Sequence, residues 1–311
     1  MSRLILLGPQ RHCVTVGKAV KSLRINGPIA TITAGWQERE AEVEELDTYL
    51  GQTSVNLLLH KRTEAIFRED PDLRESHRVH QQKLKRLQVL YRVRLQNAMD
   101  SVQKLLARRN DAAEELLDPE IEDAILAVRN LDHHHLRRIK EIRLEFEAHW
   151  RPTDRPALSR HYHDLAETLT QCSALVIAGG HVAVLLNRMR LFNLAPFLND
   201  LPILAWSAGA MVLGAQVVLF HDDPPQGRGV AEVFESGLGL FDDMIPLPHA
   251  GKRLMLEDEA RVSVFARRFK GSSCLTLDGG SRLERRGGRW RKGTKVMRLA
   301  EDGSTQLWEG S

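Results

Sequence analysis

The chain of 311 residues has only three cysteines, Cys13, Cys172 and Cys274, and their spacing matches no metal-ligand pattern. We therefore expect reduced thiols, with neither a disulfide framework nor a zinc site. No apolar run is long enough to cross a bilayer, and the apolar stretch at residues 4–7 is too short for a secretory signal, so we expect a cytoplasmic protein without membrane contact. A net charge of +3, from 44 basic and 41 acidic residues, gives no reason to expect nucleic-acid binding.

Short apolar runs alternate with helical patterns through most of the chain. Strands are predicted at residues 4–7, 29–33, 55–59, 174–178, 203–206 and 217–219, and helices at 14–24, 37–50, 156–171 and 181–191. Such alternation is typical of βαβ units, which build a parallel sheet covered by helices on both faces. We predict an α/β fold, a three-layer sandwich with a mostly parallel sheet, and a small antiparallel ending after Ser272.

Between residues 68 and 150 the strand pattern stops, and charged residues surround apolar positions spaced three and four apart. Two long helices fit this spacing. Their predicted apolar stripes are Leu84, Leu87, Tyr91, Leu95, Ala98, Val102 and Leu105, then Ile121, Ile125, Val128, Ile139, Ile142 and Phe146. Asn110-Asp111 and Asp118-Pro119 are predicted breaks. We predict a helical hairpin insertion over 68–150 in an α/β hydrolytic core of residues 1–67 and 151–311.

Residues 201–211, Leu-Pro-Ile-Leu-Ala-Trp-Ser-Ala-Gly-Ala-Met, have the pattern of a buried strand that ends at a serine and continues as a helix of small residues. This pattern indicates a nucleophile elbow, in which Ser207 projects its hydroxyl above the sheet edge. Ala208 is then the first residue of the helix, and its N–H is free to stabilise an oxyanion. The alternative is an ordinary turn with Ser207 as the helix N-cap.

A serine hydroxyl needs a nearby imidazole to attack at neutral pH, and the imidazole needs an acid to orient it. His249 follows a short apolar strand in Met-Ile-Pro-Leu-Pro-His-Ala-Gly, and the carboxyl ends of parallel strands collect ligands, so we predict His249 to be the general base. Gly179-Gly180 follows the predicted strand at 174–178 and precedes a helix. The Gly180 N–H is therefore the predicted second oxyanion donor.

The chain resembles the aspartyl dipeptidase (dipeptidase E) and cyanophycinase family of serine peptidases, on the class I glutamine amidotransferase-like fold. Trp206-Ser207-Ala208-Gly209-Ala210 is similar to the family's elbow, and Ala178-Gly179-Gly180-His181 to its Gly-Gly-Asn loop. Pro248-His249 is similar to the pair that holds the catalytic histidine, and Phe220-His221-Asp222-Asp223-Pro224 to an Asn-Asp-x-Pro stretch of dipeptidase E. The resemblance covers roughly residues 1–60 and 155–285, and it is specific from 174 to 250.

The resemblance implies that Asp222 is the acid of the triad, because the family's aspartate lies at the same distance after the serine. The chain between Asp222 and His249 is longer than in dipeptidase E, so four further acids stay open for this role. These are Asp223, Glu235, Asp242 and Asp278. His181 replaces the family's asparagine, so only a backbone role is carried over there. Serine stands where true glutamine amidotransferases have cysteine, so we do not expect glutaminase activity.

These residues predict a serine hydrolase that cleaves peptide or isopeptide amide bonds through an acyl-enzyme, a reaction that requires no metal and no organic cofactor. We expect Gly179, His181 and Trp206 to line the substrate site. Because the family favours Asp-containing substrates, one of Arg228, Lys252 and Arg253 is expected to pair with a substrate carboxylate.

Two further hypotheses fit the same sequence. An esterase or transacylase would use the same triad, whereas a catalytically inactive or partner-activated scaffold would bind a protein partner through residues 70–150. A homodimer is also expected, because the seam of the hairpin and the habit of the family favour a two-fold interface.

Overall fold

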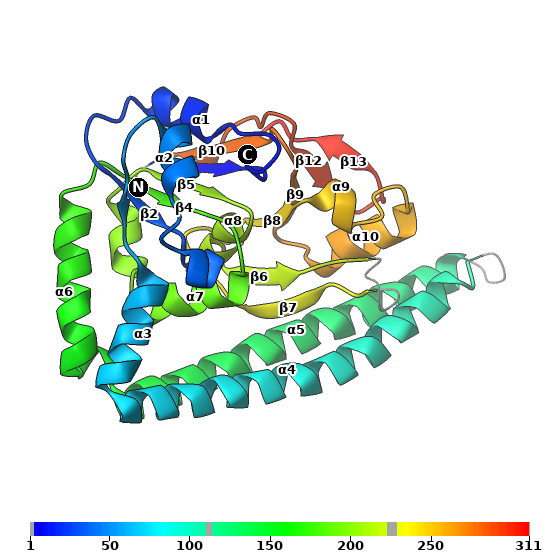
Figure 1. The fold of residues 1–311 in the computed structure, drawn as a ribbon. Helices are drawn as coiled ribbons and strands as arrows, with labels where there is room; N and C mark the ends of the chain where they lie inside the picture. The colour runs from blue at the N-terminus through cyan, green and yellow to red at the C-terminus, as the bar shows by residue number, and fades with distance from the viewer. Residues whose placement is uncertain (1–2, 110–113, 223–228, 311) are drawn as a thin grey trace.

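The computed structural model describes residues 3–109, 114–222 and 229–310 (Figure 1). Its main sheet has seven strands in the order β11-β10-β1-β5-β4-β2-β3. The bounds are β1 (Leu4–Leu7), β2 (Ile29–Ile32), β3 (Val55–Asn56), β4 (Ala174–Ile177), β5 (Ile203–Trp206), β10 (Arg282–Arg286) and β11 (Arg289–Trp290). Strands β1 to β5 run parallel, and β10 and β11 join antiparallel at one edge. The predicted α/β class with a mostly parallel sheet is confirmed.

Helices cover both faces of this sheet because successive side chains of a strand point to opposite faces. Ile5 and Leu7 of β1 pack with α1 (Val16–Leu23) and α2 (Glu44–Leu50), whereas Leu4 and Leu6 belong to the larger core on the other face. The helices of that second face are α3 (Leu59–Glu69), α6 (Pro156–Thr170), α7 (Val182–Leu191) and α8 (Ala208–Leu213). Short 3-10 helices lie at Ala34–Arg39, Pro152–Asp154 and Ala195–Asn199.

Two smaller sheets complete the molecule. The first has the order β13-β12-β9-β8, and the second pairs β6 with β7. The bounds are β6 (Gln216–Leu219), β7 (Glu232–Ser236), β8 (Met244–Pro248), β9 (Ser273–Leu277), β12 (Met297–Leu299) and β13 (Thr305–Leu307), with α9 (Ala250–Arg253) and α10 (Glu259–Arg268) between β8 and β9. Strand β8 runs parallel to β9.

Some predicted elements are wrong in extent or place. The strand predicted at 217–219 lies in the separate antiparallel β6-β7 pair, outside the parallel sheet. The strand predicted at 55–59 ends at Asn56, because Leu58 turns into the left-handed region and α3 begins at Leu59. The helix predicted at 37–50 is a 3-10 helix followed by the shorter α2. The ending after Ser272 is not wholly antiparallel, because β9 pairs parallel with β8 and β10 joins the main sheet.

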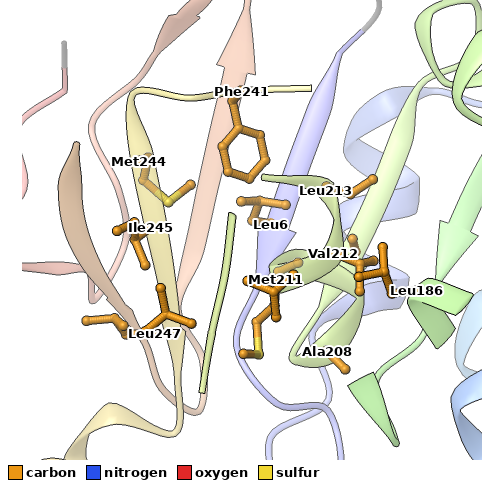
Figure 2. Close-up of a cluster of buried hydrophobic side chains, with 14 of the residues drawn as sticks. Leu6, Leu186, Ala208, Met211, Val212, Leu213, Phe241, Met244, Ile245 and Leu247 are labelled. Carbon is orange, nitrogen blue, oxygen red and sulfur yellow. The ribbon is translucent and has the colours of Figure 1, made fainter. Parts of the chain in front are cut away.

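Helix α8, which follows Ser207, is buried between the seven-stranded sheet and the four-stranded sheet. Every residue of α8 is buried. Figure 2 shows Met211 of α8 beside Leu247 and Ile245 of β8, while Val212 lies against Leu186 of α7. The larger core therefore joins the two sheets through α8.

The predicted hairpin is formed by α4 (Pro71–Leu106) and α5 (Glu114–Trp150), which run along the lower side of the molecule in Figure 1. Both predicted apolar stripes are at least half-buried. The predicted break at Asn110-Asp111 lies in residues 110–113, outside the described residues. The break predicted at Asp118-Pro119 is wrong, since Pro119 lies inside α5. There it removes a single helical hydrogen bond near the start of a helix that Ile121 and Ile125 anchor in the core.

The solvent-facing side of α4 exposes Val79, Val89, Leu90 and Val93. The predicted partner surface at residues 70–150, the predicted homodimer and the predicted division into two parts stay predictions. Among the described helices, none combines the length and the apolar character needed to cross a bilayer.

A buried polar network fastens the hairpin to the core. Arg268 of α10 donates to both carboxylate oxygens of Asp132 on α5, at 2.7 and 2.8 Å, and to Ala231 O at 2.6 Å. Tyr91 of α4 donates to Asp132 at 2.7 Å and accepts the N–H of Val233 in β7 at 3.1 Å. Four segments far apart in the sequence thus share one set of hydrogen bonds, and the position of the hairpin depends on it.

Replacing Arg268 by alanine should lower the free energy of unfolding by about 3–5 kcal/mol, because it leaves Asp132 charged, buried and without its partner. Urea unfolding at neutral pH measures the change. Lys270→Ala is the matched control, since its pair with Glu301 is exposed and should contribute less than about 1 kcal/mol. Equal losses in the two variants would show that the network does not hold the hairpin.

Candidate active site

Ser207 lies on a sharp turn between β5 and α8. Its backbone has φ 50° and ψ −122°, a conformation that non-glycine residues rarely adopt. Although Ser207 holds the N-cap position of α8, its side chain makes no capping hydrogen bond. The prediction of an ordinary N-cap is therefore wrong, and the hydroxyl is available for other contacts, as a nucleophile elbow requires.

The helix after Ser207 lies unusually close to the neighbouring strand. A Cβ built on Gly209 would overlap the carbonyl oxygen of Ile177 and lie 2.9 Å from that of Ala178. Any side chain at position 209 would push α8 away from β4. The small residues of the elbow are thus required by this contact, and the contact sets where Ser207 projects.

The Gly179-Gly180 loop faces Ser207 directly. A Cβ on Gly179 would lie 2.9 Å from Ser207 Cβ and 3.5 Å from Ser207 Oγ. Gly180 has φ 122°, and a Cβ there would overlap the backbone of Gly35. Both glycines are therefore required by their surroundings, one by the serine and the other by the loop after β2.

Two backbone N–H groups near Ser207 are candidates for holding an oxyanion. Ala208 opens α8, so its N–H has no acceptor within the helix. Within the described part of the chain, the N–H of Gly180 has no backbone acceptor either. The next N–H, of His181, donates to Gly35 O at 2.8 Å, and the His181 ring accepts from Val184 N at 3.3 Å. His181 therefore caps α7, and its predicted contact with substrate stays a prediction.

His249 follows β8 in a left-handed conformation, with φ 60° and ψ 30°, and is half-buried. Burial and the positive charge of Arg253 lower the pKa of His249 below its usual value, the negative charge of Asp278 raises it, and Lys252 lowers it slightly. The imidazole is therefore neutral at pH 7 and able to accept a proton, as a general base must be.

The ends of four strands bring Ser207 and His249 to one edge. Trp206 pairs with Leu7 across β5 and β1, and the residue that follows β1, Gly8, packs directly on the backbone of Asp278. Asp278 follows β9, whose last residue Leu277 accepts the N–H of His249 at 3.3 Å. Ser207 and His249 thus follow strands of different sheets that meet through Gly8 and Asp278.

The candidate acids lie in very different surroundings. Asp278 accepts the N–H of Gly251 in α9, at 3.2 Å, and acts electrostatically on His249. Asp222 instead pairs with Arg261 at 2.9 Å and accepts the N–H of Met255 at 3.0 Å. In the described ranges, no carboxylate forms a hydrogen bond with the His249 ring.

Two further acids, Glu235 and Asp242, lie where they do not orient the imidazole of His249. Glu235 is paired with Arg143 and Arg190. Asp242 precedes β8, so five strand residues, about 17 Å, separate it from His249. Asp223 and Arg228 lie outside the described residues.

The model of peptidase family S51 matches residues 135–293, just over half of the sequence, and the matched range holds Ser207, His249 and both glycines. The chain belongs to peptidase family S51. The resemblance to the dipeptidase E and cyanophycinase family is thereby confirmed, and membership supports a serine peptidase.

A search of solved structures found matches to this S51 chain at low sequence identity, two of which follow. A crystal structure of a peptidase from an acI-B1 Actinobacterium is 14% identical and has a TM-score of 0.48, over 97% of this chain and 91% of that one. A crystal structure of a putative peptidase E protein from Listeria monocytogenes EGD-e is 10% identical and has a TM-score of 0.44, over 96% of this chain and 100% of that one. A search of curated proteins found no match.

The remaining predicted residues divide between core and surface. Trp206 is 7% exposed and packs in the core beneath the sheet edge. Lys252 and Arg253 lie on α9, next to His249, where their charges act on its imidazole. Their predicted pairing with a substrate carboxylate stays a prediction. Across the described residues, no three His, Cys, Asp or Glu side chains gather in a way that could hold a metal ion.

Sequence reasoning missed one part of this site, the loop after β2. It touches the Gly-Gly loop through Gly35. The signal was present, because β2 and β4 are parallel neighbours and loops at the carboxyl ends of neighbouring strands meet.

Replacing Gly179 by alanine should slow the reaction of Ser207 with a fluorophosphonate at least about tenfold, because the added methyl group displaces the serine. Intact mass spectrometry over time measures the labelling. Gly51→Ala, at a left-handed turn (φ 75°) where a Cβ meets nothing within 4 Å, is the control: its backbone strain lowers stability far from Ser207, and the folded variant should react like wild type. Unchanged labelling of folded Gly179→Ala would show that Ser207 does not need this contact.

Proposed function

We propose that this S51 chain is a serine hydrolase that cleaves peptide or isopeptide amide bonds through an acyl-enzyme. The observation that carries the proposal is the strained turn at Ser207, whose side chain makes no capping bond and faces the Gly179 loop. Strain of this kind costs about 1–3 kcal/mol and persists where function requires it.

In the proposed reaction, Ser207 Oγ bonds to the carbonyl carbon of the scissile amide while its proton passes to the neutral imidazole of His249. The carbonyl oxygen becomes an oxyanion, which the N–H groups of Ala208 and Gly180 stabilise, each by about 3 kcal/mol in the barrier. The carbon–nitrogen bond then breaks, and the leaving amine takes the proton from His249. Water, activated by the same imidazole, hydrolyses the ester and frees Ser207.

We propose Asp278, in place of Asp222, as the acid that stabilises the His249 imidazolium. Asp278 follows the strand beside that of His249, and its charge already raises the pKa of the imidazole. Asp222 is engaged by Arg261 and by the Met255 N–H, which is the environment of a structural carboxylate.

The charges around His249 bear on the substrate. Lys252 and Arg253 place two positive groups on α9, directly after the base. A carboxylate on the substrate would be attracted to them, which supports an Asp-containing peptide as substrate. The S51 family membership agrees with peptide cleavage in general.

Labelling with an alkyl fluorophosphonate tests the activated serine. Wild type should take up one probe per chain. Ser207→Ala and His249→Ala should not be labelled, because the first lacks the nucleophile and the second lacks its base. Ser101→Ala and His163→Ala, at exposed or half-exposed sites on α4 and α6, are the controls and should be labelled like wild type. A folded wild type that takes up no probe would overturn the proposal and favour a partner-activated or inactive scaffold.

The acid can be identified from the pH dependence of that labelling between about pH 4 and 8. The reaction should fall as His249 gains a proton, and the fall should lie below the usual histidine pKa because burial lowers that of His249. Asp278→Asn removes the charge that raises this pKa, so the fall should move to still lower pH. Labelling at pH 7 should also drop by about a hundredfold or more.

Asp222→Asn serves as the matched comparison. Because Asp222 is paired with Arg261, removing its charge should not change the pH at which labelling falls. The opposite result, with the profile moved by Asp222→Asn and not by Asp278→Asn, would return the role to Asp222.

A further inference from the structure

Gln37, in the loop after β2, has a backbone conformation that matches that of the nucleophile. It has φ 60° and ψ −121°, and Ser207 has φ 50° and ψ −122°. These values lie outside the left-handed helical region, which residues such as Leu58 and Arg24 of this chain occupy. A glutamine has no intrinsic reason to adopt them, and such outliers cluster at functional sites.

Contacts place this loop next to the serine. Strand β2 pairs with β4 up to Ile32 and Ile177, so both strands end at the same edge. A Cβ on Gly35 would lie 2.8 Å from the carbonyl oxygen of Gly179, and Gly179 itself faces Ser207. Gln37 is two residues beyond Gly35.

The residue before each strained position is a tryptophan. Trp206 is buried in the core cluster under α1 and α2, and Trp36 packs against the same cluster. The two indole rings therefore fix the two turns from the same side of the sheet. This anchoring is independent of the Gly35 contact and agrees with a position of the Gln37 turn at the same sheet edge as Ser207.

The loop is also held rigidly from behind. The Thr33 hydroxyl and the Asn56 amide both donate to Glu40 O at 2.8 Å, and the Glu40 N–H donates to Gln37 O at 2.9 Å. The Glu40 carboxylate accepts the N–H groups of His60 and Lys61, at 2.9 Å each. These bonds fix the residues that follow Gln37 and leave the turn little freedom to relax.

We propose that Gln37 is a substrate-binding residue, whose side-chain amide forms hydrogen bonds with a peptide group next to the scissile bond. An amide carries a donor and an acceptor, which complement the C=O and N–H of a peptide group without selecting a charge. The Gln37 side chain is half-buried, and over residues 3–109, 114–222 and 229–310 it has no hydrogen-bond partner in the protein. This proposal rests on the proposed serine hydrolase.

Two serine-reactive probes test it. One is an alkyl fluorophosphonate, which has no peptide group, and the other is a dipeptidyl diphenyl phosphonate, which places one peptide group beside the reacting phosphorus. In Gln37→Ala, the rate of the peptidyl probe divided by that of the alkyl probe should fall about three- to tenfold, the effect of losing one hydrogen bond. Gln96→Ala, an exposed glutamine on α4, is the control and should keep the wild-type ratio.

Gln37→Gly separates binding from backbone strain. Glycine adopts the conformation of residue 37 without cost, so a purely structural role would leave the ratio in Gln37→Gly at the wild-type value. A binding role predicts that the ratio falls in both variants. Where a peptide substrate is cleaved, KM should rise by the same factor with little change in kcat.

Each outcome bears on a defined claim. If both probes label wild type and Gln37→Ala keeps the wild-type ratio, the role of Gln37 is overturned and the proposed hydrolase stands. If only the alkyl probe reacts with wild type, peptide recognition by Gln37 is overturned as well. If neither probe reacts, the activated serine fails, and the role of Gln37 fails with it.

Discussion

The close contact between α8 and β4 is the constraint on which the rest of the site depends. Because Gly209 allows the helix to lie against the carbonyl oxygens of Ile177 and Ala178, the turn at Ser207 is compressed into a conformation that serine otherwise avoids. The same contact brings the Gly179 loop against the serine, and Gly180 brings the loop after β2 against Gly179. Three strand ends are thus locked together by backbone contacts that leave no room for side chains.

Much of this could be predicted from sequence because the decisive signals are local. Two short segments each contain a strand, the end of that strand and the start of the following helix. They are Ala174–Ile177 followed by two glycines, and Ile203–Trp206 followed by serine and small residues. The boundary errors are also local. Leu58 adopts a left-handed conformation, which a leucine does not predict. Pro119 is tolerated inside α5 because tertiary packing outweighs the loss of one hydrogen bond.

The acid of the proposed triad could not be predicted with the same certainty, because the surroundings of each candidate depend on pairing between distant segments. Asp222 and Asp278 both follow plausible strands in the sequence. Only the parallel pairing of β8 with β9 brings Asp278 beside the strand that carries His249, and only the folding of α10 brings Arg261 to Asp222. The loop after β2 was missed for a similar reason, since its contact with Gly180 spans more than a hundred residues.

The proposed nucleophile and base belong to different sheets, and this arrangement gives the core between the sheets a second role. Ser207 follows a strand of the seven-stranded sheet, His249 follows one of the four-stranded sheet, and α8 fills the space between them (Figure 2). Buried side chains such as Met211 and Ile245 fill that space, so their volume bears on the separation between the His249 imidazole and the Ser207 hydroxyl. In the proposed reaction, apolar residues with no chemistry of their own then act as a spacer between the two groups, so a change in their volume should alter rate as well as stability.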